Sequence, residues 1–238
     1  PDEKKTESTD TVNDTTSKMS VPSEPAAKTQ NMDAISVAPN LYKMANDSMG
    51  IRILNIVYKP GDSSGMHSHP DGVLYVIDGG KSQFTLADGT KQVYDLKAGT
   101  AMVSPAGTHS VKNIGTTTTN AVLFEVNRPD KSAAPPDPAM DATKVAPNLY
   151  KLIKDTMNIR ILMATYKPGT SSAMHAHPDN AIYVVETGKG EFTMKDGTKR
   201  TNELTKGLTA IRPAEMHSVK NVGSTTMKVL LVEVNRPQ

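Results

Sequence analysis

The sequence predicts an all-β protein made of two tandem copies of one small barrel or sandwich. Three observations support this prediction. The chain repeats itself at a spacing of 108 residues, its apolar runs are short and rich in β-branched side chains, and turn residues separate these runs. No long stretch shows the period of an amphipathic helix, so we expect eight to ten strands in each copy.

The repeat sets the domain organisation. Residues 32–129 overlay residues 140–237 without a gap, and 55 of the 98 aligned pairs are identical. We therefore expect one barrel at 32–129 and a second at 140–238. Residues 130–139 between them are rich in proline and alanine, which favours an extended connection.

Residues 1–31 are rich in Thr, Ser, Asp, Glu and Lys and contain almost no large apolar side chain. Such a segment cannot offset its ordering entropy, so we expect a disordered polar tether. It resembles the stalk of exported bacterial lipoproteins, and the chain begins at Pro1, as a processed or trimmed form would. Export, either periplasmic or lipoprotein-tethered, is the expected location. An ordinary disordered terminus is the alternative.

Composition excludes several classes of partner and chemistry. The formal net charge is +2 and no basic run is interleaved with aromatic residues, so we expect no nucleic acid partner. The chain has no cysteine, which excludes disulfides and thiolate chemistry. No apolar run approaches the roughly 20 residues of a membrane-spanning helix. A small molecule is the expected partner.

The predicted strands of the first copy follow one another at short intervals. Their order is Gly50–Tyr58, Val73–Ile77, Ser82–Leu86, Thr100–Ser104 and Ala121–Asn127, and Asp88-Gly89 indicates a hairpin turn after the third. The second copy repeats the pattern.

Histidine carries the strongest chemical signal, because all six histidines fall in two equivalent sets. Two histidines at i and i+2 on a strand face the same side, about 6–7 Å apart, which is close enough to share a metal ion. A third follows in each copy. We predict metal ligands at His67, His69, His109, His175, His177 and His217. Imidazole suits Fe, Mn, Ni, Cu and Zn, so a divalent transition metal is expected without a choice among them. Polar core histidines without a metal are the alternative.

Several other residues have both a functional and a structural interpretation. Tyr75 and Tyr183 could donate to a bound oxyanion or pack in the core. Asp71 and its counterpart Asp179 could be fourth ligands or turn residues. Arg52 with Glu125 could form a substrate clamp or a cross-strand ion pair, and the ion pair is the predicted role.

Two ordered motifs carry a family resemblance. Gly61, His67 and His69 match the first motif of the cupins, and a second motif follows in each copy. The second-motif matches are Gly99, Pro105, Gly107, His109 and Asn113, and then Gly207, Pro213, His217 and Asn221, with Glu215 in place of the motif glycine. The chain resembles a bicupin, which implies two tandem double-stranded β-helix (jelly-roll) barrels and a monomer with an internal pseudo-dimer.

The chain departs from the cupin pattern at one position of the first motif. The glutamate that usually completes the first motif is absent, because its place falls on Gly72 or Val73 and on Asn180 or Ala181. The nearer likeness is to three-histidine cupins such as thiol and diketone dioxygenases, and not to manganese oxalate decarboxylases.

The implied function is metal-dependent, iron-type dioxygenase-like conversion of a small oxygen-rich anion. The alternative is a non-enzymatic module that binds a sugar or organic acid. Whether the chain is an enzyme stays open, and no catalytic residue beyond the metal ligands can be named. The two sites should prefer different guests, since Ser104, Gly107 and Thr108 become Arg212, Glu215 and Met216.

Overall fold

The computed structural model of the chain describes residues 32–127 and 136–234. The predicted tether at 1–31 and most of the predicted linker at 130–139 lie outside the described residues, and the domain boundaries stay predictions. No helix in the described part of the chain has the length and apolarity needed to cross a membrane.

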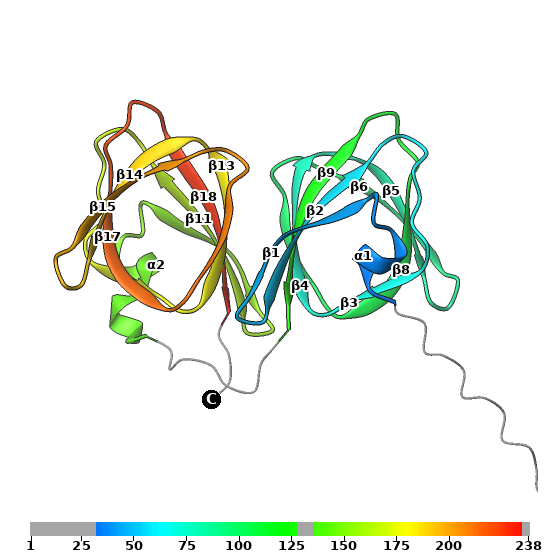
Figure 1. The fold of residues 1–238 in the computed structure, drawn as a ribbon, viewed down its shortest axis with the longest axis horizontal. Helices are drawn as coiled ribbons and strands as arrows, with labels where there is room; N and C mark the ends of the chain where they lie inside the picture. The colour runs from blue at the N-terminus through cyan, green and yellow to red at the C-terminus, as the bar shows by residue number, and fades with distance from the viewer. Residues whose placement is uncertain (1–31, 128–135, 235–238) are drawn as a thin grey trace, which may run out of the picture. The chain divides into compact units, whose positions relative to one another are not determined.

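The first barrel is built from one short helix and nine strands (Figure 1). They are α1 (Ala34–Val37), β1 (Tyr42–Ser48), β2 (Ile51–Tyr58), β3 (His67–His69), β4 (Gly72–Asp78), β5 (Gly80–Leu86), β6 (Lys91–Leu96), β7 (Ala101–Ser104), β8 (Gly107–Asn113) and β9 (Thr119–Val126).

The second barrel repeats this order after a 3-10 turn, η1 (Pro138–Met140). Its elements are α2 (Ala142–Val145), β10 (Tyr150–Thr156), β11 (Ile159–Tyr166), β12 (His175–His177), β13 (Asn180–Glu186), β14 (Gly188–Met194), β15 (Lys199–Leu204), β16 (Thr209–Arg212), β17 (Glu215–Asn221) and β18 (Met227–Val234).

Each barrel consists of two antiparallel sheets. In the first barrel a five-stranded sheet has the order β1-β2-β9-β4-β7 and a four-stranded sheet has the order β3-β8-β5-β6; the second barrel has the same orders. The predicted all-β fold of two tandem barrels is confirmed. All five strands named from the sequence are present, and the hairpin predicted at Asp88-Gly89 joins β5 to β6, with Gly89 at φ 84°. β1 was not foreseen, because most of its side chains are exposed and its sequence does not alternate.

The central strands bury both faces, which explains their near-continuous apolar sequences. In β2, Leu54, Ile56 and Tyr58 point into the first barrel, while Ile51 and Ile53 point to the other side. That outer cluster also includes Ile159 and other residues of the second barrel. Three apolar cores result, one inside each barrel and one shared by the two five-stranded sheets.

The chain before α1 braces the strand that carries the first two histidines. Asp33 caps α1, since its carboxylate accepts from the backbone N–H of Ile35 at 3.0 Å. The same segment runs beside β3, where the N–H of Ser68 donates to the carbonyl of Met32 at 2.7 Å. The position between His67 and His69 is thereby tied to a second element.

Candidate metal centre

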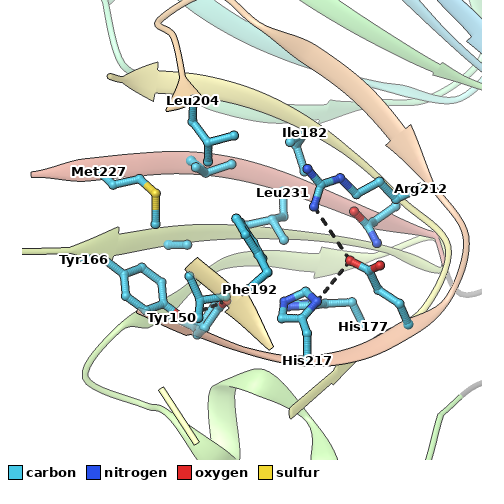
Figure 2. Close-up of a pocket in the computed structure, with 15 residues that line it drawn as sticks. Tyr150, Tyr166, His177, Ile182, Phe192, Leu204, Arg212, His217, Met227 and Leu231 are labelled. Carbon is cyan, nitrogen blue, oxygen red and sulfur yellow. Dashed lines mark hydrogen bonds and ion pairs between the residues drawn. The ribbon is translucent and has the colours of Figure 1, made fainter. Parts of the chain in front are cut away.

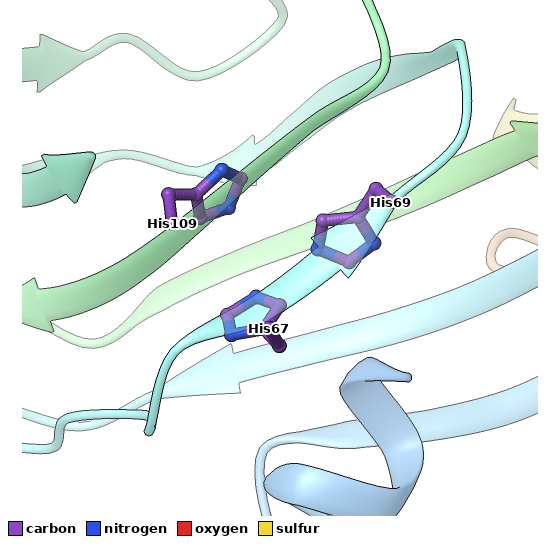
Figure 3. A group of neighbouring side chains, drawn as sticks. All are labelled: His67, His69 and His109. Carbon is purple, nitrogen blue, oxygen red and sulfur yellow. The ribbon is translucent and has the colours of Figure 1, made fainter. Parts of the chain in front are cut away.

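The three histidines of the first barrel converge on one place in the four-stranded sheet. His67 and His69 lie on β3, and His109 lies directly opposite His67 on the neighbouring strand β8. One ring nitrogen of each residue lies within 4.8 Å of one from each of the others (Figure 3). His67 is fully buried, and the other two rings are partly accessible.

The second barrel brings its own triad together in the same way. His175 on β12 pairs with His217 on β17, His177 follows two residues on, and the nitrogens again lie within 4.8 Å of one another. Here all three residues are buried. The prediction that the three histidines of each copy lie together is therefore confirmed in both barrels. Their role as metal ligands stays a prediction.

A chain of two tyrosines ends on the first histidine of each triad. The Nδ1 of His67 lies 2.8 Å from the carbonyl oxygen of Gly65, which can only accept, so Nδ1 carries the proton. The lone pair is then on Nε2, where the hydroxyl of Tyr42 donates at 3.0 Å, and Tyr58 donates to Tyr42 at 3.0 Å.

The second barrel copies this arrangement. The hydroxyl of Tyr150 lies 2.9 Å from Nε2 of His175, and Tyr166 donates to Tyr150 at 3.0 Å. The sequence analysis missed Tyr42 and Tyr150. The available signal was their recurrence at the repeat spacing.

A buried carboxylate orients the second histidine. Glu125 on β9 is fully buried and accepts from Nδ1 of His69 at 2.6 Å, which leaves Nε2 of His69 with its lone pair toward the triad. The other oxygen of Glu125 accepts from Nε of Arg52 at 2.5 Å, and Arg52 also contacts Asp33. The predicted cross-strand ion pair is confirmed, and it has a further partner in His69.

The equivalent network of the second barrel joins His177 to Glu233 at 2.7 Å, Glu233 to Arg160 at 3.2 Å, and Arg160 to Asp141 at 2.5 Å. An imidazole whose Nδ1–H is held by a carboxylate keeps a fixed orientation, and its Nε2 is more basic. Both barrels therefore hold this histidine in a set position.

Burial keeps four of the six imidazoles neutral, those of His67, His109, His175 and His217. It lowers the pKa of His109 to about 4 and that of His175 to about 3. It also lowers the pKa of His67 and of His217. At neutral pH these rings are unprotonated and have a lone pair to offer, as a metal ligand requires.

The donor atoms fit a divalent metal ion. In the second barrel, Nε2 of His177 and Nδ1 of His217 are buried and form no hydrogen bond within the described residues. Buried polar atoms normally form hydrogen bonds, so two such nitrogens within one triad indicate that a further ligand binds there. Three imidazoles are the donor set of many first-row metal sites.

The two barrels differ sharply in the space beside the triad. The cavity of the first barrel is about 460 Å³, and its lining includes Pro70 and the residues from Ser104 to Thr108. That of the second is about 40 Å³, and Glu215 and Arg212, the second of which is labelled in Figure 2, are among its lining residues. Glu215 has one carboxylate oxygen 3.0 Å from Nδ1 of His217, and this contact contributes to a pKa of Glu215 below its usual value despite burial.

Tyr75 and Tyr183 do not lie in the cavities, where a role in substrate binding would place them. Their rings pack against one another, with centroids 5.4 Å apart, in the core shared by the two five-stranded sheets. Neither residue lines the cavity of its barrel. The proposed contact with substrate is therefore corrected to a packing role, because both side chains project from the outer face of the sheet.

Asp71 and Asp179 have the turn role and not the ligand role. Asp71 accepts from the backbone N–H of Ala106 at 2.8 Å, and Asp179 accepts from that of Ala214 at 2.8 Å. Each carboxylate thus holds the turn that precedes the strand of the third histidine.

The missing motif glutamate has a steric reason in the first barrel. A Cβ atom on Gly72 would lie 2.5 Å from the carbonyl oxygen of Phe124. No side chain fits there without a shift of β9. In the second barrel the same place is taken by Asn180, which is buried and donates to the carbonyl of Pro178 at 2.8 Å.

Comparison with known proteins agrees with this description. Residues 162–233 match a family model described as a cupin domain. No curated protein is detectably similar in sequence.

Solved structures are similar in fold. AerE from Microcystis aeruginosa has a TM-score of 0.57 at 15% identity, covering 82% of this chain and 98% of that one. A cupin 2 conserved barrel domain protein from Leptotrichia buccalis has a TM-score of 0.50 at 13% identity, covering 82% and 88%. An oxalate decarboxylase from Bacillus subtilis with Mn(II) centres has a TM-score of 0.55 at 17% identity, covering 80% and 70%.

Fold and motif positions define the class, and the chain has the cupin fold. More narrowly, it has two tandem barrels of this fold, each of which brings three histidines together.

Proposed function

We propose that the chain is a metal-dependent enzyme of the iron-type dioxygenase class, acting in its first barrel on a small molecule with an oxygen-rich anionic end. The observation that supports this most is the convergence of His67, His69 and His109 beside a cavity of about 460 Å³. A cavity of this size accommodates a small-molecule ligand.

The charge of the site favours an anionic guest. All three candidate ligands are neutral, and the nearby Glu125 is already engaged by His69 and Arg52. A divalent ion held there would keep its full positive charge. Such a metal supplies Lewis acidity and, in the case of iron with open positions, oxygen chemistry. The chain's own residues position the ligands, shape the cavity and exclude water.

The residues that line the cavity indicate a second feature of the proposed substrate. Most of the lining is apolar, with Leu74, Phe84 and Met102 among its residues, while Ser82 and Gln92 add polar groups. A substrate with an anionic end at the histidines and an apolar body along this lining would match both the metal site and the cavity. We therefore extend the proposed substrate from a purely oxygen-rich anion to one that also has an apolar part.

The test begins with elemental analysis of protein purified without added metal. Iron-loaded protein is then given a panel of diketones, thiols and hydroxy acids while oxygen consumption is recorded. We expect uptake with at least one diketone or hydroxy acid. It should be lost in His69→Ala and retained in His177→Ala, which leaves the first triad intact. Absence of bound metal even after loading would refute the proposal.

A binding module is the second candidate, and one observation favours it. Among the described residues that line the first cavity, none is Asp, Glu or Lys, so no charged side chain there is placed for acid-base catalysis. Measurable affinity of the metal-loaded protein for a sugar or organic acid, without oxygen uptake or product, would favour this candidate.

Two further proposals concern the whole chain. We propose export, which the composition of residues 1–31 supports. We also propose a monomer with an internal pseudo-dimer, which the apolar core shared by both barrels supports.

A further inference from the structure

The two histidine sites carry different residues at one equivalent strand position. Glu215 is the first residue of β17, where the first barrel has Gly107 on β8. It lies directly opposite His177 on β12 and two residues before His217 on its own strand. Since side chains alternate along a strand and directly paired residues share a face, Glu215 points to the same side as the triad.

The carboxylate of Glu215 is held next to the donor nitrogens. Its Oε1 lies 3.0 Å from Nδ1 of His217, without the geometry of a hydrogen bond, and the side chain is 23% exposed. Arg212 lies on the outer side, with Nη1 3.7 Å from the same oxygen, and its guanidinium stacks over Phe192 at 5.7 Å (Figure 2). The carboxylate of Glu215 thus has the arginine and the histidine as its neighbours.

Two buried nitrogens indicate that a ligand is expected at this place. Nε2 of His177 and Nδ1 of His217 form no hydrogen bond within the described residues. These two imidazole nitrogens and the neighbouring carboxylate are jointly a donor set that a divalent cation would satisfy.

We propose that Glu215 is a built-in carboxylate ligand of the second metal site, which makes it a three-histidine, one-carboxylate site closed to carboxylates from solution. The first site keeps the equivalent place open, because Gly107 has no side chain. This inference rests on the proposed metal binding. The carboxylate comes from the second motif and not from the first-motif position, where Asn180 stands.

The cavities agree with this division. The second barrel leaves about 40 Å³ beside its triad and the first leaves about 460 Å³. A guest carboxylate could reach the first ion but would find its place in the second barrel already taken. The built-in negative charge should also bind the cation more tightly in the second barrel.

The experiment uses the full chain in two forms that each retain one triad. His69→Ala leaves the second site and His177→Ala leaves the first. Each is loaded with Co²⁺, whose visible absorption reports coordination, and titrated with acetate. We expect acetate to change the spectrum of the first site and to leave that of the second unchanged over the same range.

Reciprocal substitutions test the position itself. In the second site, Glu215→Gly should weaken Co²⁺ binding by at least about tenfold and make the spectrum respond to acetate. In the first site, Gly107→Glu should abolish the acetate response. A Cβ atom at Gly107 would meet nothing closer than 3.8 Å, so the backbone there has room for a side chain to begin. Glu215→Gln separates ligation from filling of space, because glutamine fills the mouth without the charge and should also weaken Co²⁺ binding.

The outcomes distinguish the two proposals. Failure of both sites to bind Co²⁺ would refute the metal function as a whole. Binding in the second site with an acetate response equal to that of the first would refute the role of Glu215 and leave the metal function standing. The same holds if Glu215→Gln binds Co²⁺ as tightly as the parent and gives the same spectrum.

Discussion

Replacing Tyr42 with phenylalanine should strengthen metal binding in the first barrel. The hydroxyl of Tyr42 donates to Nε2 of His67 at 3.0 Å, and Nδ1 of the same ring is engaged by the carbonyl of Gly65 at 2.8 Å. The nitrogen available to a metal is therefore the one that already accepts a hydrogen bond. Metal binding must break this bond, and Tyr42→Phe removes that cost in advance.

The magnitude follows from the value of one buried hydrogen bond. A net contribution of about 0.5–1.5 kcal/mol corresponds to a gain in metal affinity of about 2- to 12-fold. Tyr42 is only 2% exposed, so its hydroxyl cannot turn to water once it is displaced. The phenyl ring retains the packing, and the variant should fold with a slightly lower melting temperature.

The assay is a competition titration of Co²⁺ against a chromophoric chelator in the His177→Ala background, which reports the first site alone. Tyr58→Phe is the matched control. Tyr58 donates to Tyr42 and does not touch the histidine, so its loss should change the affinity little. A tenfold weaker affinity of Tyr42→Phe would refute the reasoning and would indicate that the hydroxyl itself supports the bound metal. Tyr150→Phe in the His69→Ala background repeats the test in the second barrel.

Three further predictions follow from the same network. Glu125→Gln should lower metal affinity in the first barrel by about 10- to 100-fold, because His69 loses its charged orienting partner, while the affinity of the second barrel, measured in the same titration, stays unchanged. The metal-free fold should lose stability as the pH falls below 6.5, because burial lowers the pKa of His109 and His175 in the folded state, so the unfolded chain binds protons first. Urea unfolding at pH 7 and pH 5 should show a loss of about 1–2 kcal/mol for each such histidine, and equal stability at both pH values would contradict this sign. Gly72→Glu should lower the melting temperature markedly without adding a ligand, because its Cβ would lie 2.5 Å from the carbonyl oxygen of Phe124. Gly107→Glu is the comparison, because a Cβ atom there has no close neighbour. Similar melting temperatures for the two variants would show that β9 moves easily to make room.

The two sites have the same kinds of residue supporting their histidines but differ in the residues that line their cavities. The tyrosine pair and the contact between the buried glutamate and its histidine recur in both barrels with nearly the same distances. The arginine recurs too, at 2.5 Å from the glutamate in the first barrel and 3.2 Å in the second. The residues that differ between the barrels include residues that line the two cavities, where Gly107 of the first barrel corresponds to Glu215 of the second. Such a pattern is expected when the support of the histidines is needed in both barrels but access is needed in only one.

The amino-acid sequence by itself determined the repeat, the strand-rich fold and the grouping of the histidines. These features are local: side chains two apart on a strand share a face, and an ungapped repeat copies that face 108 residues later. The third histidine of each set could be assigned because its motif has a recognisable spacing. Asp71 and Tyr75 show the limit, since alternation alone does not say which side of a bent or doubly buried strand is the inside.

Only the tertiary structure decided what surrounds each imidazole and how much room is left beside it. Glu125 is 56 residues from His69 and Tyr42 is 25 residues from His67, and closure of the barrel brings each pair into contact. The contrast between about 460 Å³ and about 40 Å³ likewise depends on how side chains from several strands fill one interior. Packing across a closed barrel is a property of all its strands together, and for that reason no single stretch of sequence reveals it.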